Sequence, residues 1–278
     1  AHNNKGVILQ KLRKFNESLK SYNSAFKINP NYNFLLGKVV YIKSCLSDWK
    51  SFDEDLNRLK DKLNNNEASS LPFTTLTLYD LPLLQKKAAE IWIKKTYSNK
   101  NKLEPISKYK PNKKIRLGYF SADFHNHATS LLIAHMLELH DKSKFELFGF
   151  SFGPDKKDEM RKRVSSSFDH FIDVRLKSND DISKLSRSFK IDIAIDLKGL
   201  TTDEKFGIFL NRCAPIQVSY LGYPATTGTN FIDYIIADKV LIPKENQKFF
   251  SEKIIYLPDT YQPNDFTKKI SKSFFTRE

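Results

Sequence analysis

The chain has 278 residues, a formal net charge of +14 and a hydrophobic fraction of 40%, which is enough for a sizeable core in one large domain or two smaller ones. No apolar run approaches the roughly 18 residues of a membrane-spanning helix, and the first residues show no signal-peptide pattern. Only nine of the 46 basic residues are arginines, and the lysines are dispersed, so the composition argues against a nucleic-acid interface.

Residues 3–32 have the spacing of a helix-turn-helix repeat. The positions that match the 34-residue tetratricopeptide repeat are Gly6, Phe15, Tyr22, Ala25 and Pro30. Ala25 lets two helices approach closely, and Pro30 ends the second helix. An isolated amphipathic hairpin is the alternative interpretation. Because one repeat cannot bury its own apolar face, we expect further repeats before the first residue.

The next segment predicts a second pair of helices, over residues 33–63. The repeat spacing is lost there, which indicates a helical cap, and Trp49 is predicted to anchor that cap. Residues 1–63 therefore form the first predicted domain. Residues 64–114 are predicted to be a connecting segment with one helix, from Leu83 to Tyr97, followed by a basic linker.

From residue 115 onward, short apolar runs alternate with amphipathic segments. Strands are predicted at Ile115–Phe120, Phe145–Phe152, His170–Asp173, Ile191–Asp196, Gln217–Leu221, Tyr234–Ala237 and Lys253–Leu257. Helices are predicted at about Thr129–Leu139, Lys157–Ser166, Asp181–Ser188 and Lys205–Asn211. Nearly continuous apolar strands are typical of a parallel sheet covered on both faces. Residues 115–278 therefore predict a doubly wound α/β domain with a mostly parallel sheet.

A polar turn joins the first of these strands to the first helix and contains Asp123, His125 and His127. Ligands of such sheets bind outside the carboxyl ends of the strands, which is where this turn lies. An imidazole titrates near neutral pH, so His127 is a candidate general base or substrate-orienting residue; a plain surface histidine is the alternative. Asp123 is either an acceptor in the site or the N-cap of the helix. His125 receives no role and is expected in a helix or at the surface.

A second polar group ends the strand that begins near Asp192. It contains Asp196, Lys198 and Gly199. Gly199 permits a positive φ or a close backbone approach. Lys198 either meets an anionic ligand or is simply solvated. We expect this group to meet His127 and the turn at residues 222–224 on one side of the sheet.

Several motifs in one order carry a resemblance to a known family. They are Phe120-Ser-x-Asp-Phe, Asn126-His127-Ala-Thr129-Ser, Arg212-x-Ala-Pro-Ile-Gln-Val218, Leu221-Gly-Tyr-Pro224 and Thr227-Gly228. This series resembles the protein O-linked N-acetylglucosamine transferases, glycosyltransferase family 41, and the alanine after His127 resembles the bacterial members. Cys213 and Ala225 depart from the proline and glycine of the family pattern. The alanine is expected to restrict a turn that normally tolerates positive φ.

The resemblance implies a glycosyltransferase-B-like lobe after a tetratricopeptide-repeat segment, and inverting transfer of N-acetylglucosamine from UDP-N-acetylglucosamine to Ser or Thr of proteins. It implies catalytic roles for His127 and Asp123. The resemblance and the polar group after Asp196 together give the candidate substrate-binding residues Thr129, Lys198, Gly199, Leu221, Gly222, Tyr223 and Pro224. No metal and no cofactor is expected, only the donor substrate. Thr129 is equally suited to a helix start.

Family members hold the nucleotide mainly in a second α/β lobe, and no phosphate-cradling glycine loop occurs before residue 278. We therefore expect an incomplete catalytic region that is inactive alone. Protein or peptide acceptors are expected at the repeats, with no membrane partner. The two cysteines, Cys45 and Cys213, form neither a disulfide framework nor a metal spacing, which fits the cytoplasm. A non-enzymatic repeat scaffold that binds peptide partners is the alternative function.

Overall fold

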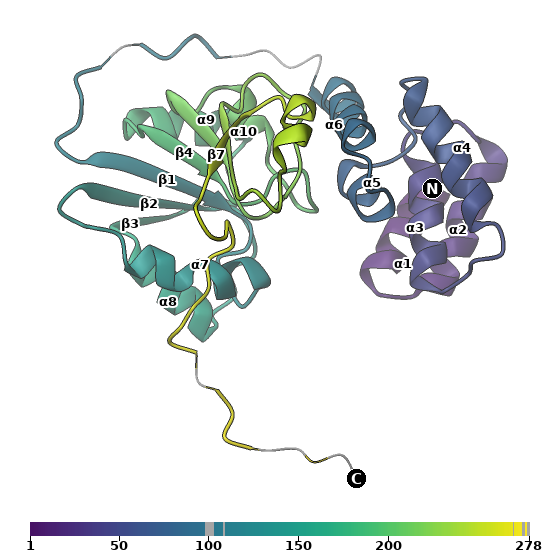
Figure 1. Cartoon of the computed structure of the whole chain (residues 1–278), viewed down its shortest axis with the longest axis horizontal. Coiled ribbons are helices and arrows are strands. Elements are labelled where there is room, and N and C mark those ends of the chain that lie inside the picture. The colour runs from purple at the N-terminus through teal and green to yellow at the C-terminus, as the bar shows by residue number, and fades with distance from the viewer. Residues whose placement is uncertain (98–102, 108, 269, 274–275, 277–278) are drawn as a thin grey trace.

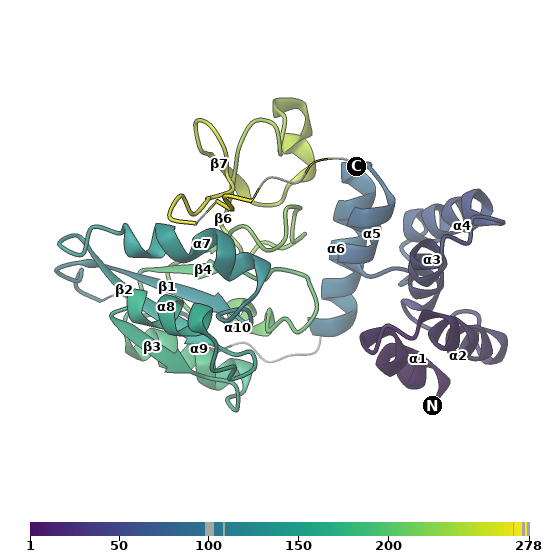
Figure 2. The ribbon, with the colours of Figure 1, turned by 90° about the horizontal axis from the view of Figure 1, so that it is seen from below.

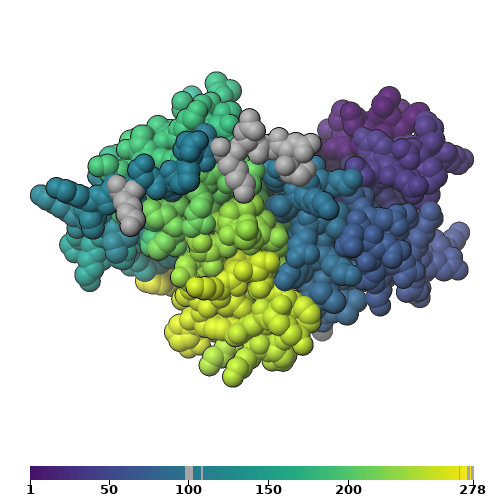
Figure 3. Space-filling view, turned by 90° about the horizontal axis from the view of Figure 1, so that it is seen from above, coloured from purple at the N-terminus to yellow at the C-terminus, as the bar shows by residue number. Residues whose placement is uncertain are grey.

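The computed structural model describes residues 1–97, 103–107, 109–268, 270–273 and 276. A helical part occupies one end of the molecule and a seven-stranded sheet with its helices occupies the other (Figure 1). In the space-filling view, the blue residues of the connecting helices lie between the purple first helices and the green and yellow sheet domain (Figure 3). Across the described residues, no helix is both long and apolar enough to cross a membrane.

Four helices form the first part of the chain: α1 (His2–Lys11), α2 (Phe15–Ile28), α3 (Leu35–Cys45) and α4 (Phe52–Asn64). The first two pack as the repeat spacing predicts, because a Cβ atom at Gly6 would overlap the ring of Tyr22. The hydroxyl of Ser18 donates to the carbonyl oxygen of Gly6 at 2.8 Å and closes the same contact. The expected all-helical segment is therefore confirmed.

Trp49 does not anchor this helical part as predicted. Its side chain is 56% exposed and meets Phe52 edge to face, with ring centroids 4.9 Å apart. The core between α3 and α4 is instead built from fully buried leucines, Leu59 and Leu63. The tryptophan lies in the turn before α4, which begins at Phe52.

The connecting segment contains two helices rather than the single predicted one: α5 (Pro72–Leu78) and α6 (Pro82–Tyr97). Pro72 occupies the first helical position of α5, which suits its fixed φ and its missing N–H. A helix of seven residues is too short to show a helical period, so the sequence pattern did not reveal it. On α6, Ala88 and Ile91 join the core of the helical part, whereas Ala89 joins the core of the sheet domain.

The sheet contains β1 (Ile115–Ser121), β2 (Phe145–Ser151), β3 (His170–Asp173), β4 (Ile193–Asp196), β5 (Ile216–Ser219), β6 (Tyr234–Ala237) and β7 (Lys253–Tyr256). All six neighbouring pairs are parallel, in the order β3-β2-β1-β4-β5-β6-β7, and Gly118 of β1 aligns with Phe148 and Ala194. The predicted doubly wound, parallel α/β fold is confirmed, and each predicted strand is present.

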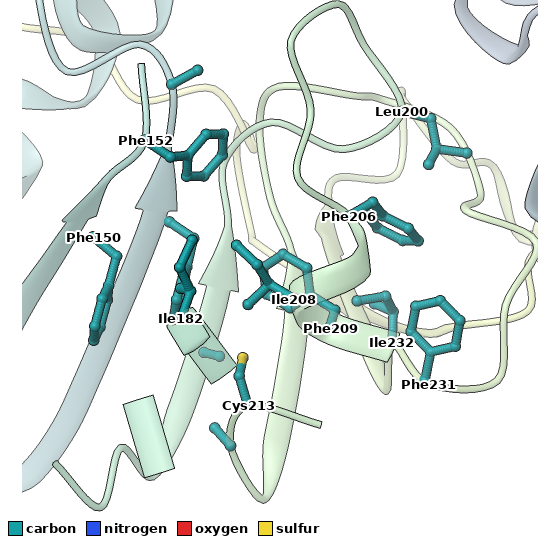
Figure 4. Close-up of a cluster of buried hydrophobic side chains, with 14 of the residues drawn as sticks. Phe150, Phe152, Ile182, Leu200, Phe206, Ile208, Phe209, Cys213, Phe231 and Ile232 are labelled. Carbon is teal, nitrogen blue, oxygen red and sulfur yellow. The ribbon is translucent and has the colours of Figure 1, made fainter. Parts of the chain in front are cut away.

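Helices cover both faces of the sheet, because side chains alternate along each strand. Leu117 and Tyr119 pack with α7 (Ala128–Glu138) and α8 (Glu159–Ser167). Phe120, whose ring stacks on Phe150 at 4.4 Å, faces α9 (Asn179–Ser188) and α10 (Gly207–Leu210) in a second core. Figure 4 shows part of this core, with Phe150, Ile182 and Phe209 labelled. The short 3-10 helix η1 (Lys244–Phe249) lies beside β6 and β7 (Figure 2).

The strand order reverses at β1. The chain moves from β1 to β2 and β3 on one side, and then returns to place β4 on the other side of β1. Connections after β1 and β4 therefore leave the sheet in opposite directions. In open parallel sheets, the crevice at such a reversal is where ligands bind.

Candidate active site

A cavity of about 220 Å³ lies at the carboxyl ends of β1 and β4, where the strand order reverses. Its lining residues come from α5, from the loops after β1, β4 and β5, and from the start of α7. They are Phe73, Asp123, His127, Thr129, Lys198, Thr201, Thr202 and Gly222. The expected convergence of His127, Lys198 and the 222–224 turn on one side of the sheet is thus observed through Gly222.

The turn after β1 is held by hydrogen bonds at both ends of Asp123. Its backbone N–H donates to the hydroxyl oxygen of Ser121 at 2.9 Å, and its carbonyl oxygen accepts the hydroxyl of Ser130 at 2.6 Å. The N-cap of α7 is His127, whose Nδ1 accepts the backbone N–H of Thr129 at 3.2 Å. Asp123 is therefore not the helix cap, and its carboxylate remains directed to the site.

The loop after β4 is folded around Asp196. This buried carboxylate accepts the backbone N–H groups of Lys198 and Gly199 at 2.9 and 3.0 Å. Burial raises the pKa of Asp196 to about 7, although the two donors favour its charged form. Asp196 does not line the cavity; it shapes the turn that presents Lys198.

Two glycines bring the loops after β4 and β5 together. Gly199 has a φ of +57°, and a Cβ atom there would overlap the Cβ atom of Tyr223. A Cβ atom at Gly222 would overlap the carbonyl oxygen of Leu197. Gly199 therefore shows both the positive φ and the close approach that a glycine permits, and only glycine fits there without strain.

An ion pair crosses the cavity between loops that are 75 residues apart in the sequence. Nζ of Lys198 lies 3.1 and 2.8 Å from the two carboxylate oxygens of Asp123. The side chains are only 12% and 8% exposed, so water screens the pair poorly. Nδ1 of His127 lies 3.7 Å from Oδ2 of the same carboxylate, beyond ordinary hydrogen-bond length.

The half-buried ring of His127 is less basic than an exposed histidine. Burial lowers its pKa, nearby Asp123 opposes that effect, and the charges of Lys198, His125 and Lys156 lower the pKa further. The ring is therefore neutral at neutral pH. Because Nδ1 accepts a backbone N–H, the single ring proton of this state lies on Nε2.

The remaining predicted binding residues surround the cavity without lining it: Gly199, Leu221, Tyr223 and Pro224. The Tyr223 side chain is 1% exposed and packs inside the domain, so its ring offers a ligand no surface. Their binding roles stay predictions. Positive φ in this turn occurs at Leu221, with +67°, and not at Ala225, which is buried in the core. The expected restriction at Ala225 stays a prediction, because a φ that is not positive is what such a restriction would leave.

Sequence reasoning missed four residues of this region. Phe73 lies on the short helix α5, which gave no periodic signal. Thr201 and Thr202 follow Gly199 in the chain, so their nearness to that turn was the signal that could have found them. His125 was expected in a helix or at the surface, but it is buried in the turn after β1, with its ring centroid 5.8 Å from that of His127.

A larger cavity of about 770 Å³ lies between the linker and the opposite edge of the sheet. Asp192 and Pro215, which precede β4 and β5, contribute to its wall. Ligands of parallel sheets bind at the carboxyl ends of the strands, and this cavity lies at the amino ends. We therefore assign the candidate active site to the smaller cavity that contains His127.

Comparison with known proteins gives a consistent family assignment. Residues 46–274 match the model of glycosyl transferase family 41, and residues 1–32 match the tetratricopeptide repeat. A mutant of the O-GlcNAc transferase of Thermobaculum terrenum shares the fold, with a TM-score of 0.74 and 21% sequence identity. That superposition covers 94% of this chain and 51% of the solved chain.

Curated relatives show the same likeness in sequence. The probable UDP-N-acetylglucosamine–peptide N-acetylglucosaminyltransferase SEC of Arabidopsis thaliana is 38% identical over 165 residues, which is 59% of this chain and 17% of the relative. The UDP-N-acetylglucosamine–peptide N-acetylglucosaminyltransferase of Caenorhabditis elegans is 35% identical over 158 residues, which is 56% of this chain and 14% of the relative. The match thus spans about a sixth of the length of these relatives.

Proposed function

The chain belongs to glycosyl transferase family 41, and from that premise we propose that it forms the acceptor-side catalytic lobe of a protein O-N-acetylglucosaminyltransferase. The donor would be UDP-N-acetylglucosamine and the acceptor a Ser or Thr hydroxyl of a protein. The relatives that are named for this reaction support the proposal. The observation that carries it is the meeting of His127, Asp123 and Lys198 in one cavity at the reversal of strand order.

The proposed reaction is a direct displacement. The acceptor oxygen attacks the anomeric carbon of the sugar, the bond from that carbon to the diphosphate breaks, and UDP leaves with the electron pair. Configuration at the carbon inverts, and the hydroxyl proton passes to a base. His127 is our candidate for that base, and Lys198 offers positive charge to an anionic group that enters the cavity.

The cavity by itself is too small for both substrates. Its 220 Å³ falls below the roughly 300–1,000 Å³ of pockets that enclose a drug-sized ligand. We propose that a second α/β lobe holds the nucleotide, because about half of the solved Thermobaculum chain lies outside the superposition. Without that lobe, the chain loses positioning that is worth roughly 7–11 kcal/mol, so we expect no turnover from it alone.

The remaining parts of the proposal concern partners and location. We propose that protein acceptors bind along the repeat helices and reach the cavity past Phe73 of α5. The reaction would use no metal and no cofactor besides the donor. Both cysteines are free thiols, which supports a reducing compartment such as the cytoplasm.

The test is a transfer assay with sugar-labelled UDP-N-acetylglucosamine and a Ser/Thr peptide, on the full-length gene product that contains this chain. His127→Ala should lower the rate by about 10²–10⁴-fold, the usual contribution of acid-base action. His170→Ala is the matched control, because His170 is similarly exposed but lies on β3 and pairs with Glu146. Its rate should be unchanged.

Three results would contradict the proposal or one of its parts. Equal rates for the wild type and His127→Ala would remove His127 from the chemistry. A folded full-length protein that transfers no sugar would favour the alternative function, a repeat scaffold that binds peptides. Robust transfer by the 278-residue chain alone would show that the donor site had been misplaced.

A further inference from the structure

We propose that Lys198 is a positioning residue that decides which ring nitrogen of His127 carries the proton, because Lys198 occupies the carboxylate of Asp123. While this ion pair is closed, the histidine presents an N–H to the cavity and cannot accept a proton there. When an anionic group draws Lys198 away, Asp123 becomes the acceptor for Nδ1–H and the ring becomes a base. The catalytic consequence rests on the function proposed above, whereas the protonation state does not.

The first step of the argument is competition for one oxygen atom. Oδ2 of Asp123 lies 2.8 Å from Nζ of Lys198 and 3.7 Å from Nδ1 of His127. The lysine also reaches Oδ1 at 3.1 Å, so it engages both oxygens of the carboxylate. The shorter, charge-assisted contact is the stronger one. Both carboxylate oxygens of Asp123 therefore bind Lys198, and Nδ1 of His127 lies outside hydrogen-bond range of the carboxylate.

The second step concerns the free side of the ring. Because the carboxylate does not hold Nδ1, this nitrogen accepts the backbone N–H of Thr129 at 3.2 Å. A nitrogen that accepts a hydrogen bond carries no proton, and a neutral imidazole has one proton in total. The proton must therefore lie on Nε2. An Nε2–H group can donate to a substrate oxygen, but it cannot take a hydroxyl proton.

The third step is the alternative arrangement. If Lys198 leaves, the carboxylate of Asp123 is a stronger acceptor than a neutral ring nitrogen, and it can orient Nδ1–H as buried aspartates do beside histidines. One proton is then gained at Nδ1 and one is lost from Nε2, through solvent. Thr129 loses its cap acceptor. The hydrogen bond that Nδ1–H gains to an ionised carboxylate is stronger than the one that is lost and outweighs that cost.

Four charged or titratable groups act on the ring: Asp123, Lys198, His125 and Lys156. The exposed Lys156 influences the ring through its charge, while the contact with the carboxylate belongs to Lys198. A substitution of Lys156 is therefore a control: it removes a positive charge near the His127 ring and leaves the contact between Lys198 and the Asp123 carboxylate in place. Removal of either lysine raises the pKa of His127, but only removal of Lys198 should relocate the ring proton.

The experiment is ¹⁵N NMR of the histidine rings in the 278-residue chain, titrated with pH. His127→Gln identifies the His127 signals. In the wild type at high pH, Nδ1 should resonate as an unprotonated nitrogen and Nε2 as a protonated one. In Lys198→Met the protonated and unprotonated signals should exchange between the two nitrogens, and the pKa of His127 should rise. Lys156→Met should raise the pKa without exchanging them, and Lys198→Arg should restore the wild-type pattern.

A second comparison guards against local misfolding. Lys198→Gln removes the charge at nearly constant length, and Asp123→Asn with Lys198→Met removes the acceptor as well. The glutamine variant should show the exchanged pattern, and the double variant should return to the Nε2–H form. A folded Lys198→Met or Lys198→Gln chain that keeps the Nε2–H form would overturn the proposal. That result would leave the transferase proposal untouched, because the latter is decided by sugar transfer.

Discussion

The helical part and the sheet domain depend on contacts of very different range. In the helical part, the decisive contact joins Gly6 with Tyr22 and with Ser18, only 12 residues from Gly6. In the sheet domain, the candidate site requires Asp123 and Lys198, which are 75 residues apart. A repeat can therefore fold through contacts between neighbouring helices alone, as in other quasi-one-dimensional arrays. The site exists only if the whole sheet is assembled in the right order.

Helix α6 (Pro82–Tyr97) is where the two regions meet. Ala88 packs against the core of the helical part, and Ala89 against the core of the sheet domain. Gly228 approaches the backbone of α6 closely, with its φ of +65°. The helix is thus apolar on two sides, and damage to one region reaches the other mainly through it.

The largest expected effect is the loss of a central ring from the sheet domain. Phe120 is fully buried, and Phe120→Ala should lower the free energy of unfolding by about 3–5 kcal/mol. Hydrogen exchange should accelerate in β1 and β4, while amides of α2 and α3 keep their protection. Leu176→Ala, at a fully exposed position, should change stability by less than about 0.5 kcal/mol. Equal acceleration in α2 would contradict the separation of the two regions.

The next effect is a pH dependence that belongs to the sheet domain. Burial raises the pKa of Asp196 from 3.8 to about 7, so between these values the folded chain holds a proton that the unfolded chain has lost. Stability should therefore fall as the pH rises through this window, by up to about 4 kcal/mol, and level off above it.

The measurement for Asp196 is urea denaturation of the wild type and Asp196→Asn at several pH values. The difference between the two stability curves isolates the effect of Asp196, because the other titrating groups are present in both proteins. Among those groups, His127 and His140 have lowered pKa values, which make stability rise with pH instead of fall. In the helical part, Asp55 instead pairs with Lys43 at 2.6 Å, and the side chains are 18% and 19% exposed. A wild-type slope that survives in Asp196→Asn would disprove the assignment.

Two glycine substitutions compare the regions directly. Gly222→Ala places a methyl group against the carbonyl oxygen of Leu197, which is backbone and cannot move cheaply, so we expect a loss of about 1–3 kcal/mol. Gly6→Ala meets the ring of Tyr22, but alanine gains about 1 kcal/mol in a helix and offsets part of the overlap. Denaturation midpoints should show the larger loss for Gly222→Ala; the reverse order would refute this account.

The smallest effect is expected at an ion pair that spans the two regions. Lys11 of α1 lies 3.4 Å from Asp203 in the loop after β4, and the side chains are 60% and 70% exposed. A double-mutant cycle with Lys11→Ala and Asp203→Ala should give less than about 1 kcal/mol, and less still at high salt. A larger, salt-resistant coupling would mean that the repeat and the loop act as one unit.

Local pattern in the sequence determined much of this molecule. Alternating apolar runs predicted every strand of the sheet, because burial on both faces leaves a continuous apolar signal in each one. The repeat spacing predicted the first two helices, in which Gly6 packs against Tyr22. Motif order led to the family, and the position of His127 at the end of a strand marked it as a site residue. The short α5 and the exposed Trp49 were mispredicted, because neither produces a periodic signal.

Only the tertiary structure decided where the candidate site lies and how its side chains are paired. Sequence pattern reports which residues are buried, but it does not report which strand edges pair, and the placement of β4 beside β1 is such a choice. That placement brings Lys198 to Asp123, and their contact leaves Nδ1 of His127 to the backbone of Thr129. The proton on the histidine ring therefore depends on a contact across 75 residues, which no local pattern encodes.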